Sequence, residues 1–223
     1  MMGKVIMSGI VPPLVAPITG ILLSDIAEGS IVKLNENGSP VEFYVAKHDY
    51  EATLNGAGRT LMVRKDCYAR NAQVGGSNKY ASGAFDTWLN GDYKNLFDSM
   101  TKVAIGTTKF YYTVGGGDST VSTIERSVFT VSATELGEHT DYTNVEGQIL
   151  PTASILKVAN GSGFPVDWRT RTPIKTHSIN VYGFNTSGVL TPFNGGFFWS
   201  RPCLTLPSNA LFDEEAMLLK GVT

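Results

Sequence analysis

The sequence contains few cysteines and histidines, which limits the metal and disulfide chemistry available to it. Cys67 and Cys203 are its two cysteines, and it has three histidines among 223 residues. Two cysteines are too few for a disulfide framework, and neither has a histidine at the spacing of a zinc ligand. Both lie in apolar stretches, so we expect two buried free thiols rather than a bridge. We expect no metal site and no cofactor.

Charged residues are also scarce. They make up 17% of the chain, with a net charge of -2, whereas about 25% is typical. No cluster of Lys and Arg is present, so the basic patch of a nucleic-acid-binding protein is missing. An unbroken run of about 20 apolar residues, which a membrane-spanning helix needs, is missing as well. We therefore expect no nucleic-acid partner and no membrane insertion.

Glycine and aromatic residues are plentiful instead. The chain has 24 glycines, and aromatic residues make up 10% of it. This mixture is typical of a loop-rich β or α+β domain rather than a helix bundle, and the length fits one domain.

The first 23 residues differ from the rest. Prolines at positions 12, 13 and 17 interrupt an apolar run that follows Lys4, and no Ala-x-Ala cleavage site follows, so a signal peptide does not fit. We predict an extended arm over 1–23 and a single domain over 24–223. The arm either folds back on its own domain or docks on a neighbouring subunit, and docking is favoured because a free apolar segment is a liability in water. Its contact residues would be Ile10, Val11, Pro12, Pro13, Leu14, Val15, Pro17 and Ile18.

Local patterns predict several strands and two short helices. Asn37-Gly38 lies between apolar stretches at 31–34 and 41–46, which predicts a hairpin. Further strands are predicted at 59–64, 109–113, 128–131 and 177–184. Helical spacing of Phe85, Trp88 and Leu89 predicts a helix that stops at 90–91, followed by a second helix. The segments 69–82, 114–123 and 137–154 are predicted to be polar loops.

The segment 195–208 is predicted to complete the core. Consecutive aromatic residues run into Arg201-Pro202 and then into a short apolar strand that ends at a proline. We expect this strand to lie against segments made much earlier in the chain. Structural roles are predicted for Arg201, which would bind loop carbonyls and fix the last strand, and for Pro202, Trp199 and Trp88.

Acidic and glycine-rich segments suggest no catalytic residue. The glycines at 115–117 are not followed by the residues of a phosphate loop. His139, Asp141 and Glu146 fit no metal spacing. A glycoside hydrolase needs two carboxylates at a defined separation, and Glu125, Glu135, Asp141 and Glu146 lie in no recognisable motif. We therefore predict that the protein is not an enzyme.

Five motifs together resemble a known family. They are Trp88-Leu89-Asn90, Leu96-Phe97-Asp98, the segment 131–135, the segment 168–173 with its Trp, Arg and Pro, and 201–208. In this order they are similar to a DUF6273-type domain of phage and prophage structural proteins, over about 23–212. The resemblance implies a compact α+β domain with a C-type-lectin-like arrangement, mainly antiparallel strands, two short helices and long loops. It brings no established catalytic residues.

The function implied by the resemblance is that of a virion component. The protein would be a capsid decoration, head fibre or tail component, assembled in the host bacterial cytoplasm with other virion proteins as an oligomer and recognising host-surface glycans. The alternatives are a free-standing carbohydrate-binding module and a cell-wall glycan hydrolase. Trp168, Arg169 and Arg171 either face a sugar, since aromatic faces stack on sugars and Arg donates to hydroxyls, or fill the core.

Overall fold

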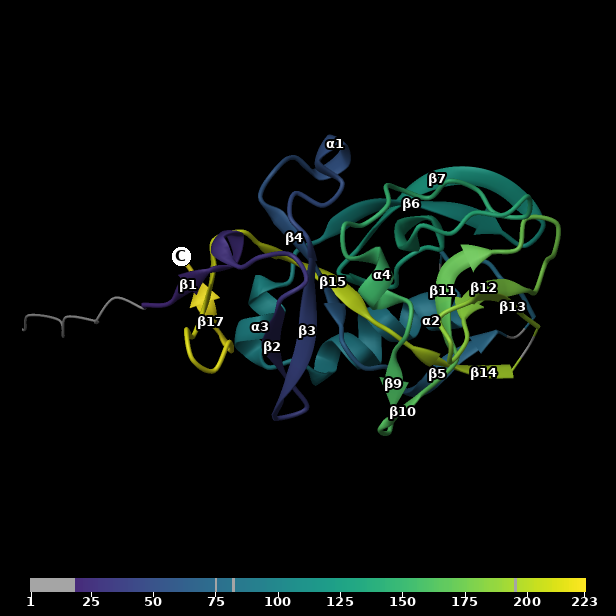
Figure 1. Cartoon of the computed structure of the whole chain (residues 1–223). Helices are drawn as coiled ribbons and strands as arrows, with labels where there is room; N and C mark the ends of the chain where they lie inside the picture. Colours follow the sequence, from purple (N-terminus) through teal and green to yellow (C-terminus); the bar gives the residue numbers. More distant parts are fainter. Residues whose placement is uncertain (1–18, 75, 82, 195) are drawn as a thin grey trace, which may run out of the picture.

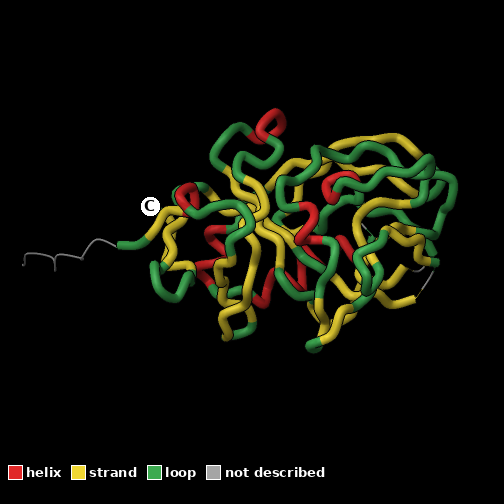
Figure 2. Tube along the Cα trace, in the orientation of Figure 1, coloured by secondary structure: helices red, strands yellow, loops and turns green. Residues whose placement is uncertain are grey.

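Strands make up most of the regular structure of the protein (Figure 2). The computed structural model describes residues 19–74, 76–81, 83–194 and 196–223. The predicted contact residues of the arm, at 10–18, lie outside the described residues. The family-implied mixture of antiparallel strands and few short helices agrees with this β-rich fold.

The elements follow one another along the chain as shown in Figure 1. The strands are β1 (Ile21–Leu22), β2 (Ile31–Glu36), β3 (Ser39–Lys47), β4 (Arg59–Arg64), β5 (Tyr68–Val74), β6 (Thr108–Gly115), β7 (Asp118–Arg126), β8 (Val128–Phe129), β9 (Asn160–Gly161), β10 (Phe164–Pro165), β11 (Trp168–Pro173), β12 (Val181–Phe184), β13 (Leu190–Phe193), β14 (Gly196–Ser200), β15 (Cys203–Pro207), β16 (Ala210–Phe212) and β17 (Leu219–Val222). The helical segments are η1 (Leu23–Asp25), α1 (Ala52–Asn55), α2 (Ala84–Trp88), η2 (Leu89–Tyr93), η3 (Lys94–Leu96), α3 (Ser99–Ala104), η4 (Thr134–Leu136) and α4 (Ala153–Leu156).

The first five-stranded sheet lies at the middle of the molecule and has the order β2-β3-β4-β15-β8 (Figure 1). Its first hairpin turns at Asn37 and Gly38, whose φ angles are 53° and 76°. These are the positive values that a two-residue hairpin turn requires, so the predicted hairpin is confirmed. Strand β15 pairs antiparallel with β4 along its whole length. The late strand is therefore laid against an early one, as the sequence predicted.

The second five-stranded sheet has the order β13-β12-β11-β14-β5. Strands β11 and β14 are parallel, with Trp168 opposite Trp199, and the other pairs are antiparallel. The prediction of a loop over 69–82 is wrong for β5, because its backbone pairs with β14. The strand predicted over 177–184 begins only at Val181.

A third sheet joins the beginning and the end of the described chain, with the order β1-β16-β17. Ile21 lies opposite Phe212 and Leu22 opposite Leu211, and Leu23 is fully buried. The folded domain therefore includes residues 21–23, which the sequence analysis had assigned to the arm.

The hairpin of β6 and β7 arches over the top of the second sheet in Figure 1. Its strands are joined at Gly116 and Gly117, and Gly115, Gly116 and Gly117 all have positive φ. The prediction of a loop over 114–123 is therefore wrong. The glycines make the turn of a hairpin, and the polar strand β7 gains its order from pairing with β6.

The helical region 84–104 also differs from the prediction. Asn90 and Gly91 do not stop the first helix, because α2 continues through a π-turn, η2, into η3. The Asn90 side chain donates to the carbonyl oxygens of Asp86 and Val128 and so ties this helix to β8. A third helix, α3, was not predicted. Its N-terminus is capped by Asp98, whose carboxylate accepts from the Thr101 N–H at 2.7 Å.

The two thiols are free and buried, which confirms that prediction. Cys203 Sγ lies 3.3 Å from the carbonyl oxygen of Phe129. Burial raises the pKa of Cys67 to about 12 and that of Cys203 well above its usual value. In the part of the chain that the structure describes, no helix combines the length and the apolarity needed to cross a bilayer.

Candidate functional site

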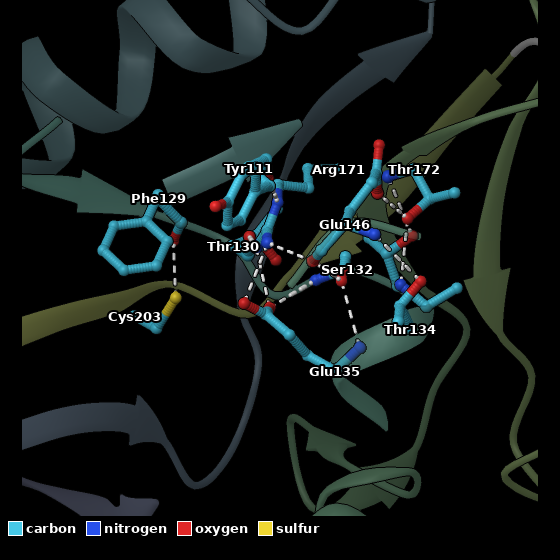
Figure 3. A network of polar contacts seen from close by, with 12 residues as sticks. Tyr111, Phe129, Thr130, Ser132, Thr134, Glu135, Glu146, Arg171, Thr172 and Cys203 are labelled. Carbon is cyan, nitrogen blue, oxygen red and sulfur yellow. Dashed lines mark hydrogen bonds and ion pairs between the residues drawn. The ribbon is translucent and has the colours of Figure 1, made fainter. Parts of the chain in front are cut away.

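A buried ion pair joins β11 to η4 (Figure 3). The guanidinium of Arg171 binds both carboxylate oxygens of Glu135, each at 2.8 Å, and both side chains are 0% exposed. Such a two-point pairing is the strongest geometry available to an arginine and a carboxylate. The pair lies where neither water nor a ligand reaches it.

The remaining donors of Arg171 bind three backbone carbonyls. Nε donates to Tyr111 O at 2.9 Å, and the two terminal nitrogens donate to Thr130 O at 2.8 Å and Glu146 O at 3.1 Å (Figure 3). With the two bonds to Glu135, all five N–H groups of the guanidinium have an acceptor. Arg171 therefore holds segments from four parts of the chain together.

Glu135 has further partners of its own. It accepts a short hydrogen bond from the Tyr50 hydroxyl and one from the Ser132 N–H at 2.8 Å. The Ser132 hydroxyl donates to Glu146 O at 2.9 Å and accepts from Glu135 N–H. This set of contacts, made by Arg171, Glu135, Ser132, Glu146, Tyr50 and their backbone partners, is called here the Arg171 network.

Glu146 lies inside this network, although no sequence pattern indicates its burial. Its side chain accepts from Thr113 N–H at 2.6 Å and from the Thr172 hydroxyl, and it is fully buried. Burial raises its pKa. His139 instead bonds to the Thr143 hydroxyl at 2.8 Å. Glu146 thus anchors the long segment between η4 and α4 to β6 and β11.

The three residues considered for a sugar-binding surface are all in the interior. Trp168 stacks on Phe184 and donates from Nε1 to Lys157 O at 3.0 Å. The guanidinium of Arg169 lies 4.5 Å from the centre of the Phe85 ring, and burial lowers its pKa to about 10. With Arg171, they are buried. The structure therefore agrees with the interpretation that these residues fill the core. Their side chains are not exposed to a sugar.

Arg201 has the contacts that the sequence analysis expected. Its fully buried guanidinium donates to the carbonyls of Arg64 and Lys65, each at 2.8 Å, and to those of Leu156 and Val158. It thereby links the passage from β14 to β15 with the end of β4, the end of α4 and the loops that follow them. Pro202 is buried beside it.

The two structural tryptophans are partly buried. Trp199 packs against Gly161, where a Cβ would lie 2.7 Å from the indole ring. Trp88 stacks against Phe85. Both therefore contribute to packing.

A small pocket lies directly outside the Arg171 network. Its volume is about 270 Å³, and it is lined by Glu51, Thr53, Tyr111, Val121, Val145, Gly147 and Gln148. We call it the Glu51 pocket. Pockets for drug-sized ligands hold roughly 300–1,000 Å³, so this one fits a small group or a single side chain.

Glu51 is the charged residue of this pocket, and it is held unusually. Only 6% of the residue is exposed, and its backbone is left-handed, with φ 48° and ψ 48°. Burial, and then the negative charge of Glu135, raise the pKa of Glu51. Strained backbone and a perturbed carboxyl group in one pocket are typical of functional sites.

Gly147 separates the pocket from the network. Its φ is 102°, and a Cβ there would lie 2.7 Å from Glu51 Oε1 and 3.2 Å from Glu135 Oε1. A side chain at position 147 would therefore collide with the carboxyl groups of both Glu51 and Glu135, so glycine is required there. The sequence analysis did not identify Glu51, because an acidic residue after a strand has the pattern of an ordinary surface turn.

The described residues hold no group of three or more His, Cys, Asp or Glu side chains placed to bind a metal ion. The Glu51 pocket thus offers one carboxyl group, one aromatic ring, one amide and two valines. This set can bind a small group that carries both charge and apolar surface.

The fold is that of a β-rich domain whose buried charges fasten loops to strands. A family model described as "Domain of unknown function (DUF6273)" matches residues 57–208, and the chain belongs to this family. No curated protein matches the chain, and no solved structure does. Two residues of the Glu51 pocket, Glu51 and Thr53, precede the matched residues. Its other lining residues lie within the match.

Proposed function

We propose that the chain is a non-enzymatic structural protein of a bacteriophage particle. It serves as a capsid decoration, head fibre or tail-tip component, and it joins other virion proteins through the segment that precedes residue 19. The resemblance of its five motifs to phage and prophage structural domains supports this role. In this proposal the protein is an oligomer in the particle and is assembled in the bacterial cytoplasm.

The observation that carries the proposal is the way the chain enters the domain. β1 pairs with β16, and a Cβ on Gly20 would lie 2.3 Å from the Phe212 carbonyl oxygen. Residues 20–22 are therefore packed tightly against β16. The segment that precedes them leaves the domain from a fixed position. That segment is apolar and rich in proline, and such a composition favours burial against a partner.

The arrangement of the loops supports a C-type-lectin-like display of a binding face. A strand near the beginning of the described chain pairs with one near its end, as in that arrangement. The long segment between η4 and α4 is held from beneath by the Arg171 network. We therefore propose host-surface glycans as ligands of the loops, with a free-standing carbohydrate-binding module as the alternative.

Two truncations test the assembly role. Removing residues 1–18 should leave the unfolding temperature unchanged and should prevent incorporation into particles. Removing 1–23 should also lower the unfolding temperature, because it deletes β1 and the buried Leu23. Incorporation is measured by co-purification with particles from a complemented host.

If a chain without residues 1–18 still enters particles normally, the proposed docking role of this segment is refuted. A glycan array with the same truncated chain tests the alternative, and binding of a sugar by free protein that enters no particle would favour it. Turnover of purified cell wall that one carboxylate substitution abolishes would instead show a hydrolase.

A further inference from the structure

The walls of the Glu51 pocket are apolar near its mouth. Val145 is 63% exposed and Val121 is 39% exposed, although both could have been replaced by polar residues at no cost to the core. The partly exposed Tyr111 adds an aromatic side chain. The lining of the pocket thus combines exposed hydrocarbon with the nearly buried Glu51.

Glu51 has no cation of its own. All five donors of Arg171 are bound to other acceptors, and the ammonium of Lys47 donates to the Gln148 side chain at 2.9 Å. No ion pair joins Glu51 to any residue among those the structure describes. A buried carboxylate normally has a paired charge. Glu51 instead accepts a hydrogen bond from the backbone of Gln148, and the positive charges of Arg171 and Lys47 act on it without forming an ion pair.

We propose that the Glu51 pocket binds a primary alkylammonium group, with the Glu51 carboxylate as its counter-ion and Tyr111, Val121 and Val145 around its alkyl chain. The group could be a free amine or the side chain of a lysine on a partner chain, since both have the same chemistry. A neutral ligand such as a sugar would leave the carboxylate uncompensated. This binding is independent of the assembly role proposed above.

The strain at Glu51 agrees with a binding role. A left-handed backbone is unfavourable for a residue other than glycine, and burial raises the pKa of Glu51 because it disfavours the ionised carboxyl group. An ammonium ion in the pocket would reverse the second effect, because an opposite charge favours ionisation. Binding should therefore release a proton near the pKa of Glu51.

The experiment titrates the full chain with n-butylammonium at constant ionic strength and pH 7.5, following the amide signal of Gly147 by NMR. We expect saturable binding in the millimolar range, which suits a ligand of about five non-hydrogen atoms. n-Butanol, which has the same shape without charge, should bind at least tenfold more weakly. The second ligand is Nα-acetyl-lysine amide, whose side-chain ammonium is free. Tighter binding of this ligand than of butylammonium indicates a lysine partner, and weaker binding indicates a free amine.

Three variants separate the site from general effects. Glu51→Gln should weaken butylammonium binding at least tenfold, and Val145→Ser, at an exposed position, should weaken it severalfold. Glu214→Gln removes the same charge from an exposed site outside the pocket and should leave binding unchanged. Equal affinity for butanol, unchanged binding in Glu51→Gln, or binding of glucose at this site in place of the amine would overturn the proposal.

The pH dependence gives an independent check. Affinity should fall as the pH is lowered through the raised pKa of Glu51, because the protonated carboxyl group carries no charge. Glu135, Arg171 and Lys47 are the charged groups that act on it from the surrounding elements. An affinity for butylammonium that stays constant from pH 8 to pH 4 would contradict the role of the carboxylate.

Discussion

Replacing Arg171 with methionine tests whether the Arg171 network determines the stability of the domain. Methionine retains much of the apolar stem but removes all five donors. The variant leaves the Glu135 carboxylate buried without its cation, and the carbonyls of Tyr111, Thr130 and Glu146 lose a donor. Removing one partner of a buried ion pair costs about 3–5 kcal/mol. Since domains are stable by about 5–15 kcal/mol, Arg171→Met should lose roughly a fifth of that stability or more.

The loss is measured by urea unfolding followed by tryptophan fluorescence. For a domain of this size, about 3–5 kcal/mol corresponds to a fall in unfolding temperature of roughly 6–20 °C. Lys65→Met is the control, because its ion pair with Glu42 is partly exposed to solvent and should contribute no more than about 1 kcal/mol. A loss below about 1 kcal/mol in Arg171→Met, with an unchanged denaturant slope, would refute the reasoning.

Three further substitutions follow from the surroundings of single residues. Because burial and the negative charge of Glu135 raise the folded pKa of Glu51, its ionisation destabilises the folded state above that pKa and not below the ordinary value of 4.5. Glu51→Gln should therefore be more stable than the wild type at pH 7. This difference should close as the pH falls towards 4, and urea midpoints that show a less stable variant at pH 7 would contradict it. Gly161→Ala should cost about 1–3 kcal/mol because its Cβ would lie 2.7 Å from the Trp199 ring. In Gly91→Ala, by contrast, the new Cβ meets no atom within 4 Å, so calorimetry should show an equal or higher unfolding temperature.

The sequence predicts those parts of the fold whose signals are local. Asn37 and Gly38 specify the turn between β2 and β3 by their own backbone preferences, and the apolar run 203–206 specifies a buried strand. Arg201 could be assigned to loop carbonyls because it precedes Pro202 in an apolar segment. In each case the residues that carry the signal are neighbours in the chain.

Two features that were missed, β5 and the continuation of α2, depend on distant partners. β5 has a polar sequence and becomes a strand because β14, more than a hundred residues later, pairs with it. The continuation of α2 past Gly91 likewise depends on Asn90, which bonds to β8. Propensity at Asn90-Gly91 favours a stop, and this tertiary contact overrides it.

The candidate site could not be predicted from the sequence either, because its residues are also distant from one another in the chain. Glu51, Glu135 and Gly147 come from three separate segments, and none has a neighbour that marks it as buried. Arg171 was identified, but as a surface group or a core residue, since nothing in the sequence pairs it with Glu135 36 residues before it. Charged residues are usually exposed, so a fully paired buried network has no local signature.

The sheet of β1, β16 and β17 decides how the domain would respond to mechanical load. Both ends of the described chain lie in this sheet, at one end of the molecule, and the β9–β10 and β13 regions lie away from it (Figure 1). A pull on residue 19 would pass first to β16, through the pairs of Ile21 with Phe212 and Leu22 with Leu211. These short pairs would yield before the two larger sheets. A tether at this end could therefore lengthen under tension while the rest of the domain keeps its fold.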